Sequence, residues 1–395
     1  MYAVVGHHFW DRPGGGELVM ASIAAGLEGD GYTPILTSLT KFDKGKYVEW
    51  FGIDLRRYPD VSLNLKMKAL GLYMRLLVWI PIKKAIEKYR PAFAVIDMPT
   101  YKPIERKIAI FEYIHFPLDL TFNPRYRDLG FYYTQDPYTA ERYGRFPMSI
   151  YAKVFEKLYR IYARENPFRS AQKVLTNSRW TADLVRRAFG EEPTVLNPPL
   201  SPTIKLEENP PGYEERERAV AMLGRYSQEK RYHWVVEKIA PRLAREAPDA
   251  KVVIMGDAST PTSRRYYEQL LSLIRKMDLN NVVLLRSPSR RTIEQTLARS
   301  VAFLHATINE HWGIAVAEAM AYGTPPIVHR SGGAWTDLAQ EGKSGLGYVG
   351  EDEAVDEIAE LLSNRKKWTY YSQKALERAR DLTFQNFVKR VQEIW

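Results

Sequence analysis

Short apolar runs alternate with longer amphipathic stretches along almost the whole chain. An apolar run bounded by glycine, proline or polar residues predicts a strand, and the stretches between such runs carry the period of a helix. The predicted strands are residues 2–6, 33–37, 92–97, 108–114, 173–176, 194–196, 219–223, 251–255, 281–285, 301–305 and 326–329. Because strands alternate with helices, we expect parallel sheets in an α/β fold with two Rossmann-like domains facing a cleft.

The alternation is interrupted in the middle of the chain. Residues 201–217 are rich in proline and glutamate and show little periodicity, which predicts a linker. We therefore expect an N-terminal domain over residues 1–200 and a C-terminal domain over residues 218–380. The last residues form an apolar helical stripe that needs burial, so we expect residues 381–395 to cross back onto the N-terminal domain.

Bulk composition narrows the class of protein. A chain of 395 residues usually forms two domains, and no apolar run reaches the roughly 18–20 residues that a membrane span needs. The start, residues 1–6, has the pattern of a first strand and lacks the basic flank of a signal peptide. The absence of cysteine excludes disulfides and thiolate metal sites. These features favour a cytoplasmic protein, either free or peripheral at the cytoplasmic face of a membrane.

The net charge of +10 is compatible with an anionic partner, and equally with a basic surface that only keeps the protein soluble. Residues 63–90 combine lysines and arginines with leucines and aromatic residues, a composition that suits a surface lying on anionic lipid. A buried helix with its cations at the ends explains the same stretch. Elsewhere the cations are scattered, which disfavours a nucleic-acid-binding protein, and no complete G-x-G-x-x-G fingerprint follows a strand, which disfavours an NAD-dependent oxidoreductase.

The most informative stretch is residues 309–320, where a predicted strand runs into a polar loop and a helix begins at Gly313. A helix N-terminus favours an anion such as phosphate, because its free N–H groups and dipole point at the ligand. Glu310 precedes this end and Glu318 lies inside the helix, and carboxylates suit hydroxyl groups. This arrangement fits a nucleotide sugar, although a helix-start charge and a solvated helix residue explain the same glutamates.

Other strand ends supply further candidates. Arg225 and Lys230 follow the strand at 219–223 and suit a pyrophosphate, Arg as a bidentate fork and Lys as a point charge. The loop with Gly14, Gly15 and Gly16 lets backbone approach a ligand closely. We expect no metal: adjacent His7 and His8 should point in different directions, and no Asp-x-Asp pair is present to chelate a divalent ion.

Several motifs together carry a resemblance. Glu310-x7-Glu318 is followed by Ala-Tyr-Gly-Thr-Pro-Pro at 321–326 and Ser-Gly-Gly at 331–333. Further matching pieces, in order along the chain, are His8 with residues 14–17, then residues 113–115, 177–181, 198–199, 224–225, 229–230 and 304–314. The chain resembles the retaining glycosyltransferases of GT-B fold that use nucleotide sugars. Within them it most resembles the α-1,2-mannosyltransferases of lipid-linked oligosaccharide assembly in the dolichol pathway.

The resemblance implies roles for named positions. It implies a metal-independent hexosyltransferase that moves mannose from GDP-mannose to a lipid-linked or glycan acceptor; a UDP-sugar enzyme of surface-polysaccharide synthesis is the alternative. The expected catalytic residues are Glu310, His115, Arg225 and Lys230. The expected donor-binding residues are Gly15, Gly16, Arg225, Lys230, Glu310, His311, Trp312, Gly313, Ile314 and Glu318. The expected residues on the acceptor side, in an acceptor-binding N-terminal domain, are His8, Gly14, Gly15 and His115.

Overall fold

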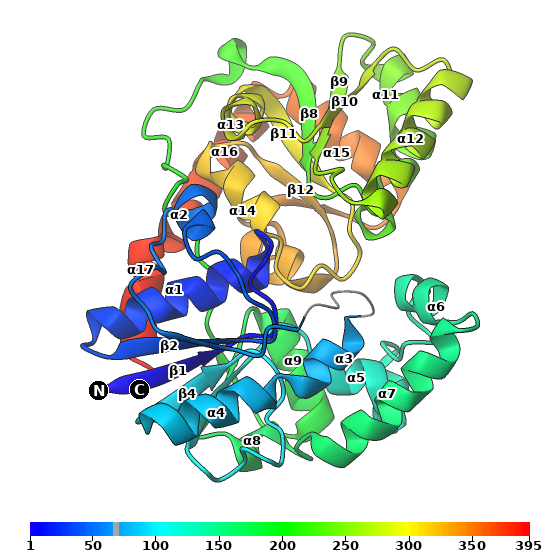
Figure 1. Ribbon diagram of the computed structural model, residues 1–395. Helices are drawn as coiled ribbons and strands as arrows, with labels where there is room; N and C mark the ends of the chain where they lie inside the picture. The colour runs from blue at the N-terminus through cyan, green and yellow to red at the C-terminus, as the bar shows by residue number, and fades with distance from the viewer. Residues whose placement is uncertain (66–70) are drawn as a thin grey trace. The chain divides into compact units, whose positions relative to one another are not determined.

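The computed structural model describes residues 1–65 and 71–395. Its chain separates into two compact units (Figure 1). The N-terminal unit contains Met1–Thr203 together with Thr383–Trp395, and the C-terminal unit contains Ile204–Leu382. Each unit is built on a parallel sheet with helices packed against it, which confirms the predicted α/β class and the two Rossmann-like domains.

Within the described residues, the sheet of the N-terminal unit has seven parallel strands in the order β3-β2-β1-β4-β5-β6-β7. Its strands are β1 (Tyr2–Gly6), β2 (Thr33–Ser38), β3 (Asp60–Ser62), β4 (Phe93–Ile96), β5 (Ala109–Ile114), β6 (Lys173–Thr176) and β7 (Thr194–Val195). The central strands are buried almost throughout because helices cover both faces of a parallel sheet, so they read as continuous apolar runs. β3 has three residues at the sheet edge, too short to give a pattern, and was not predicted.

The helices of this unit pack around the sheet (Figure 1). They are α1 (Gly15–Gly29), α2 (Lys46–Phe51), α3 (Leu72–Leu77), α4 (Trp79–Tyr89), α5 (Leu118–Phe122), η1 (Pro124–Leu129), α6 (Pro137–Tyr143), α7 (Met148–Tyr162), α8 (Pro167–Ser170), α9 (Arg179–Phe189) and α17 (Phe384–Gln392). Ser178 caps the start of helix α9, since its side chain accepts a hydrogen bond from the Thr181 amide.

The sheet of the C-terminal unit has six parallel strands among the described residues, in the order β10-β9-β8-β11-β12-β13. They are β8 (Glu217–Leu223), β9 (Lys251–Gly256), β10 (Val282–Arg286), β11 (Ser300–His305), β12 (Pro326–His329) and β13 (Leu346–Tyr348). Around them lie η2 (Tyr213–Glu215), η3 (Gln228–Lys230), α10 (Tyr232–Trp234), η4 (Val235–Ile239), α11 (Ala240–Glu246), α12 (Pro261–Lys276), α13 (Arg290–Arg299), α14 (Ile314–Ala321), η5 (Ala334–Leu338), η6 (Gln340–Gly342), α15 (Glu351–Ser363) and α16 (Arg365–Asp381).

The helical segment that follows η3 is continuous but irregular. It begins as α10, widens to a π-helix at η4 and resumes as α11. Pro241 stands in the first turn of α11. A proline inside a helix has no N–H to donate and crowds the preceding turn, so the widened segment just before it relieves that crowding.

Strand order decides where ligands bind in both units. In an open α/β sheet the strand order reverses direction at one point, and ligands lie at the carboxyl ends of the strands there. That point falls between β1 and β4 in the N-terminal unit and between β8 and β11 in the C-terminal unit. The loops that follow these four strands are therefore the positions to search for a site.

The C-terminal helix α17 belongs to the N-terminal unit, beside α1 (Figure 1). Its apolar stripe is buried there as expected: the Val391 side chain lies over Gly26, where a Cβ would stand 2.6 Å from it. The Trp395 ring packs against Phe93 and Phe111, with centroids 5.5 and 5.6 Å away. The chain thus ends on the unit in which it begins.

The stretch at residues 63–90, for which a lipid-facing surface and a buried helix were both considered, packs partly into the core of the N-terminal unit. The part of the prediction that falls on residues 66–70 lies outside the described residues. In the remainder, many apolar side chains face the core, whereas Leu77 and Ile80 are partly exposed. The buried residues are Leu72, Met74, Leu76, Val78, Ile82 and Ala85. These residues fit a helical layer of the core with peripheral cations, and contact of this stretch with a membrane stays a prediction.

Across residues 1–65 and 71–395, none of the helices has the length and apolar character needed to pass through a bilayer.

Candidate functional site

The C-terminal unit gathers predicted residues at the ends of β8 and β11. β11 ends at His305, and a loop leads to Gly313, which has φ +98° and begins α14. This left-handed conformation is open to glycine without strain. No side chain caps α14, and Ile314 at its start is partly exposed. The first amides of the helix therefore face outward, where an anionic group can reach them.

Glu310 is held by two partners in this loop. Its Oε2 accepts hydrogen bonds from Lys230 Nζ at 2.7 Å and from His305 Nε2 at 2.9 Å. The three residues come from η3, the end of β11 and the loop after it, and all three are largely buried. The structure thus brings together Lys230 and Glu310, two of the predicted catalytic residues.

The charges of this cluster are set by burial and contact. Burial raises the pKa of Glu310, but the Lys230 ammonium and the His305 hydrogen bond lower it more, so the pKa lies well below its usual value. Burial lowers the pKa of His305. A neutral His305 donates to Glu310 only as the tautomer with its proton on Nε2. At neutral pH the cluster is therefore a carboxylate shared by one ammonium and one neutral imidazole.

The segment 331–333 packs directly under the Glu310 loop. Gly333 N donates to Glu310 O at 2.7 Å, and the Ser331 hydroxyl accepts from Asn309 N at 2.7 Å. A Cβ on Gly332, which has φ +77°, would lie 2.2 Å from Glu310 O. The Ser-Gly-Gly motif therefore has a mechanical role here, since it fixes the backbone that presents the Glu310 carboxylate.

Arg225 is less constrained than Lys230. Its side chain is 69% exposed, and its guanidinium donates to Glu229 Oε1 at 3.1 Å. Arg225 therefore has to rearrange to join Lys230 at one ligand, whereas Lys230 is already in place. The backbones at Gly224 and Gly256 lie in close contact at the ends of their strands. A Cβ on Gly256 would lie 2.1 Å from Gly224 O, so this close approach requires glycine at position 256.

Glu318 lies one turn into α14 and has a partner that the sequence did not indicate. Its Oε2 accepts from Arg290 Nη1 at 2.8 Å, and Arg290 Nε donates to Glu294 at 2.9 Å. Burial raises the pKa of Glu318, and the Arg290 charge offsets part of this. Arg290 is the first residue of α13. Its guanidinium places a positive charge beside Glu318, which was predicted to bind the nucleotide.

His311 and Trp312 complete the loop. His311 is partly exposed, whereas Trp312 is buried. The indole Nε1 of Trp312 is buried without a hydrogen-bond partner in the part of the chain that is described. A buried N–H normally has a partner, so this donor is available to a ligand atom that reaches the loop.

In the N-terminal unit, a polar cluster forms at the ends of three adjacent strands, β1, β4 and β5. Gly6 pairs with Ile96, so the next residues, His7 and Asp97, emerge side by side from β1 and β4. Asp97 Oδ2 accepts from His7 Nδ1 at 2.7 Å and from His115 Nε2 at 3.2 Å. His115 follows β5 and is the predicted catalytic histidine. Its Nε2 is occupied by Asp97, so Nδ1 is the nitrogen left for a substrate.

The cluster carries a buried charge pair. Burial lowers the pKa of His7, but the Asp97 carboxylate raises it more, to about 10. Burial raises the pKa of Asp97, but the two histidines hold it well below the usual range. His7 is therefore an imidazolium at neutral pH, and Asp97 is a carboxylate that orients His115. Neither His7 nor Asp97 was predicted as a site residue; their strand-end positions were the signal that pointed to them.

The glycine loop stands next to this cluster. A Cβ on Gly16 would lie 3.5 Å from His115 Nε2 and 3.8 Å from Asp97 Oδ2. Gly14 lies against the Glu17 carboxylate, and Gly15 is the first residue of α1. The small residues thus bring the start of α1 close to the strand ends.

The expectation that His7 and His8 diverge is wrong. Their ring centroids are 4.8 Å apart, because both residues lie beyond the end of β1, where side chains no longer alternate. His7, His8 and Asp97 place potential ligand atoms within 4.8 Å of one another. Burial holds the pKa of His8 well below its usual value. Asp97 and His7 form a charge pair, but His7 Nε2, His8 Nδ1 and Asp97 Oδ1 are buried without a hydrogen-bond partner among the described residues. Metal independence therefore stays a prediction.

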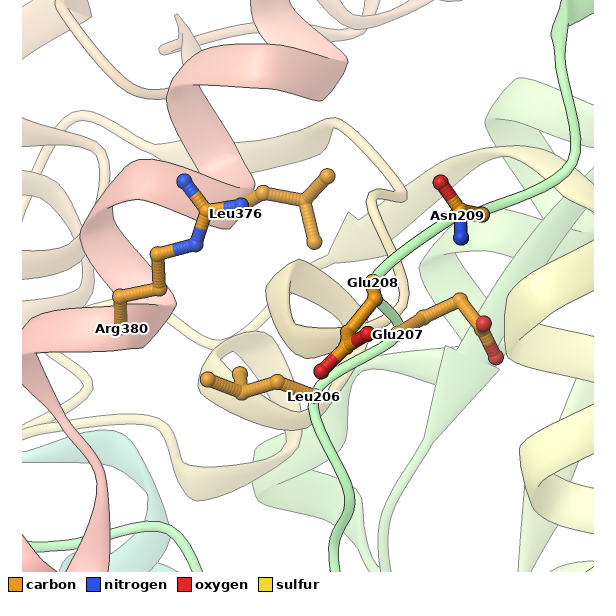
Figure 2. Close-up of a pocket in the computed structure, with 6 residues that line it drawn as sticks. All are labelled: Leu206, Glu207, Glu208, Asn209, Leu376 and Arg380. Atoms are coloured by element: carbon orange, nitrogen blue, oxygen red, sulfur yellow. The ribbon is translucent and has the colours of Figure 1, made fainter.

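A surface pocket of about 500 Å³ lies elsewhere in the C-terminal unit (Figure 2). It is lined by Leu206, Glu207, Glu208, Asn209, Leu376 and Arg380. These residues come from the segment before β8 and from α16, and none of them was predicted as a site residue. The pocket is therefore separate from the strand-end loops described above.

Comparison with known sequences agrees with the chemistry of the C-terminal unit. Residues 204–378 match the family model described as glycosyl transferases group 1. The GDP-Man:Man(3)GlcNAc(2)-PP-Dol alpha-1,2-mannosyltransferase of Dictyostelium discoideum is 25% identical over 255 residues, which are 60% of this chain and 48% of that protein. Its counterpart in Candida glabrata is 30% identical over 197 residues, 48% of this chain and 38% of that protein. The match thus spans at most about half the length of these relatives.

Comparison with solved structures confirms the fold. Anabaena Alr3699/HepE in complex with UDP and glucose superposes with a TM-score of 0.66 and 16% identity, covering 99% of this chain and 98% of that one. Sucrose-phosphate synthase of Thermosynechococcus elongatus superposes with a TM-score of 0.69 and 14% identity, covering 100% and 97%. At these identities the likeness shows the fold alone: two Rossmann-like domains, as in GT-B glycosyltransferases.

Proposed function

We propose that this chain, whose residues 204–378 are a glycosyl transferases group 1 domain, is a retaining hexosyltransferase that uses a nucleoside diphosphate sugar. The observation that carries the proposal is the contact between Lys230 and Glu310, 2.7 Å apart, beside the uncapped N-terminus of α14. A cation and free amides suit a diphosphate, and the adjacent carboxylate suits sugar hydroxyls. These are the two neighbouring parts of such a donor.

Each group then has a role in the reaction. Lys230, Arg225 and the amides at Ile314 hold the diphosphate and stabilise the charge that develops on it as it leaves. Glu310 binds hydroxyls of the sugar, and Glu318 binds those of the ribose. The bond between the anomeric carbon and the diphosphate oxygen breaks, and the acceptor oxygen bonds to that carbon on the same face. The acceptor proton passes to the departing diphosphate.

For the donor we favour GDP-mannose, on the names of the curated relatives. A UDP-sugar is the second candidate, since a protein of the same fold is known in complex with UDP-glucose. The acceptor we propose is a lipid-linked oligosaccharide or another glycan, bound by the N-terminal unit with His8, Gly14 and the Asp97-oriented His115 near its reactive hydroxyl.

Nucleotide binding tests the proposal first. Thermal-shift measurements with GDP, UDP and ADP should reveal one preferred diphosphate, and the matching sugar nucleotide should be hydrolysed slowly. Lys230→Ala should weaken binding of that diphosphate by about 1.5–3 kcal/mol, the value of a hydrogen bond to a charged group. Lys238→Ala, an exposed lysine of η4, is the matched control and should leave binding unchanged. Failure of all three diphosphates to stabilise the protein would reject the proposed function.

A further inference from the structure

Helix α7 exposes an apolar stripe on one side. Ile150, Val154 and Ile161 are 54%, 52% and 50% exposed, and Phe146, just before the helix, is 81% exposed. Spacings of four and seven residues place these side chains on one helical face. The opposite face packs into the unit: Ala152, Phe155 and Tyr159 are buried in its core. Figure 1 shows α7 at the periphery of its unit, with α3 and α5, which it contacts, on its inner side.

Cations flank this stripe. Lys153, Lys157 and Arg160 are exposed and lie along one edge of the same face. Arg142 and Arg145 precede them in the chain and are exposed as well. The acidic residue of the segment 142–161 is Glu156, which is turned away and accepts a hydrogen bond from the Tyr132 hydroxyl at 2.7 Å. The exposed face therefore combines apolar side chains with a row of positive charges.

We propose that this face, Phe146, Ile150, Val154 and Ile161 with Lys153, Lys157 and Arg160, docks the protein on an anionic lipid bilayer. Apolar side chains beside lysines and arginines are the pattern of helices that lie in the plane of a membrane interface. The apolar residues enter the acyl boundary, while the cations meet acidic headgroups. The face lies on α7, outside residues 63–90, for which the sequence suggested either a lipid-facing surface or a buried helix.

Charge favours lipid over a second copy of this chain. In a symmetric dimer the same patch meets itself, so Lys153, Lys157 and Arg160 of one copy would face the same cations of the other. An anionic bilayer offers opposite charge to every one of them. The inference goes beyond the proposed function, because it concerns where the protein is held and not what it transfers.

Vesicle flotation of the full chain tests the proposal. The protein should float with vesicles of phosphatidylcholine and phosphatidylglycerol at 7:3 and much less with phosphatidylcholine alone. The variant Lys153→Gln/Lys157→Gln/Arg160→Gln should lose on the order of a hundredfold in partitioning, since each cation near an anionic surface contributes about fivefold. Ile150→Ser/Val154→Ser/Ile161→Ser should lose at least about tenfold.

Matched controls separate this face from general basicity. Lys238→Gln/Arg245→Gln/Lys276→Gln removes three exposed cations of the C-terminal unit and should float like the wild type. Equal losses in both charge variants would overturn the assignment, as would absence of flotation in the wild type. If sedimentation showed that the wild type is a dimer and that the serine variant is a monomer, the face would be assigned to contact with a second copy. Unchanged unfolding temperatures and nucleotide binding in all variants keep the test independent of the proposed activity.

Discussion

Lys230 Nζ lies 2.7 Å from Glu310 Oε2, so the cation proposed for the donor diphosphate and the carboxylate proposed for the donor sugar are partners of each other. Their positions are 80 residues apart in the chain and meet because β8 and β11 are neighbours in the sheet. A diphosphate that binds Lys230 competes with Glu310 for it. The pair therefore couples the two ends of the donor electrostatically.

This competition predicts the behaviour of Glu310→Gln. Removing the carboxylate charge frees Lys230, so GDP or UDP, whichever the protein prefers, should bind more tightly, by about tenfold, while sugar transfer or donor hydrolysis falls strongly. A charge-assisted hydrogen bond contributes about 1.5–3 kcal/mol, of which the glutamine retains part. Calorimetry gives the affinity, and Glu237→Gln, at an exposed glutamate of η4, serves as the control and should not change binding. Weaker binding in Glu310→Gln contradicts the coupling.

Gly332→Ala should disable the site without unfolding the protein. The new Cβ would collide with Glu310 O at 2.2 Å and occupy a φ of +77° that disfavours alanine, so the Glu310 loop must shift. Donor hydrolysis should fall by at least about tenfold, since small displacements of catalytic groups are costly. Gly31→Ala is the matched control, because Gly31 has φ +79° but no atom within 4 Å of a Cβ. Equal loss of hydrolysis in both variants would show that backbone strain alone is responsible.

Asp97→Asn should destabilise the N-terminal unit in a pH-dependent way. The pKa of His7 is raised from 6.5 to about 10 in the folded chain, so the stability that its charge contributes is fully present below pH 6.5 and is lost as pH rises through about 10. The contribution of Asp97, whose pKa is depressed, is lost only in acid. Urea unfolding at pH 6 should show a deficit of about 3–5 kcal/mol for removing one partner of a buried pair. The deficit should shrink at pH 10; a constant deficit would mean that His7 is neutral throughout.

Gly26→Ala should loosen the docking of α17 on α1. The added methyl would lie 2.6 Å from Val391 Cγ1, and such overpacking costs about 1–3 kcal/mol, more than the helix propensity that alanine gains. The second substitution Val391→Ala should restore part of the loss. Gly29→Ala is the control, since its Cβ would meet the flexible end of Gln392. Hydrogen exchange of α17 measures the effect, and additive losses in the double variant would argue against direct contact.

Much of the architecture could be predicted because its signals are local. Buried parallel strands read as apolar runs, and turns and helix ends carry glycine, proline and capping residues, as Ser178 does for α9. The strand that runs into Glu310 and the helix that starts after Gly313 were visible for the same reason. The short edge strands β3 and β13 were missed because three residues give no period.

Amphipathicity did not show which helices are buried. The stretch at 63–90 combines apolar residues with cations, a pattern that both a buried helix and a lipid-facing surface explain. In the structure many of its apolar residues are buried, while Ile150, Val154 and Ile161 of α7, which carries the same kind of pattern, face outward. Helical periodicity in the sequence shows that one face of a helix is apolar. Whether other elements cover that face depends on the tertiary structure.

The sequence alone therefore determined the α/β class, the two domains and the strand ends at which Glu310, Lys230 and His115 stand, because these follow from periodic and local signals. Tertiary structure decided the pairings. His7 with Asp97 and Lys230 with Glu310 are 90 and 80 residues apart, and each pair forms only where the strand order brings two carboxyl ends together. Contacts between residues far apart in the chain leave no local pattern in the sequence. The pairing of these side chains and the charges that follow from it could therefore be read only from the tertiary structure.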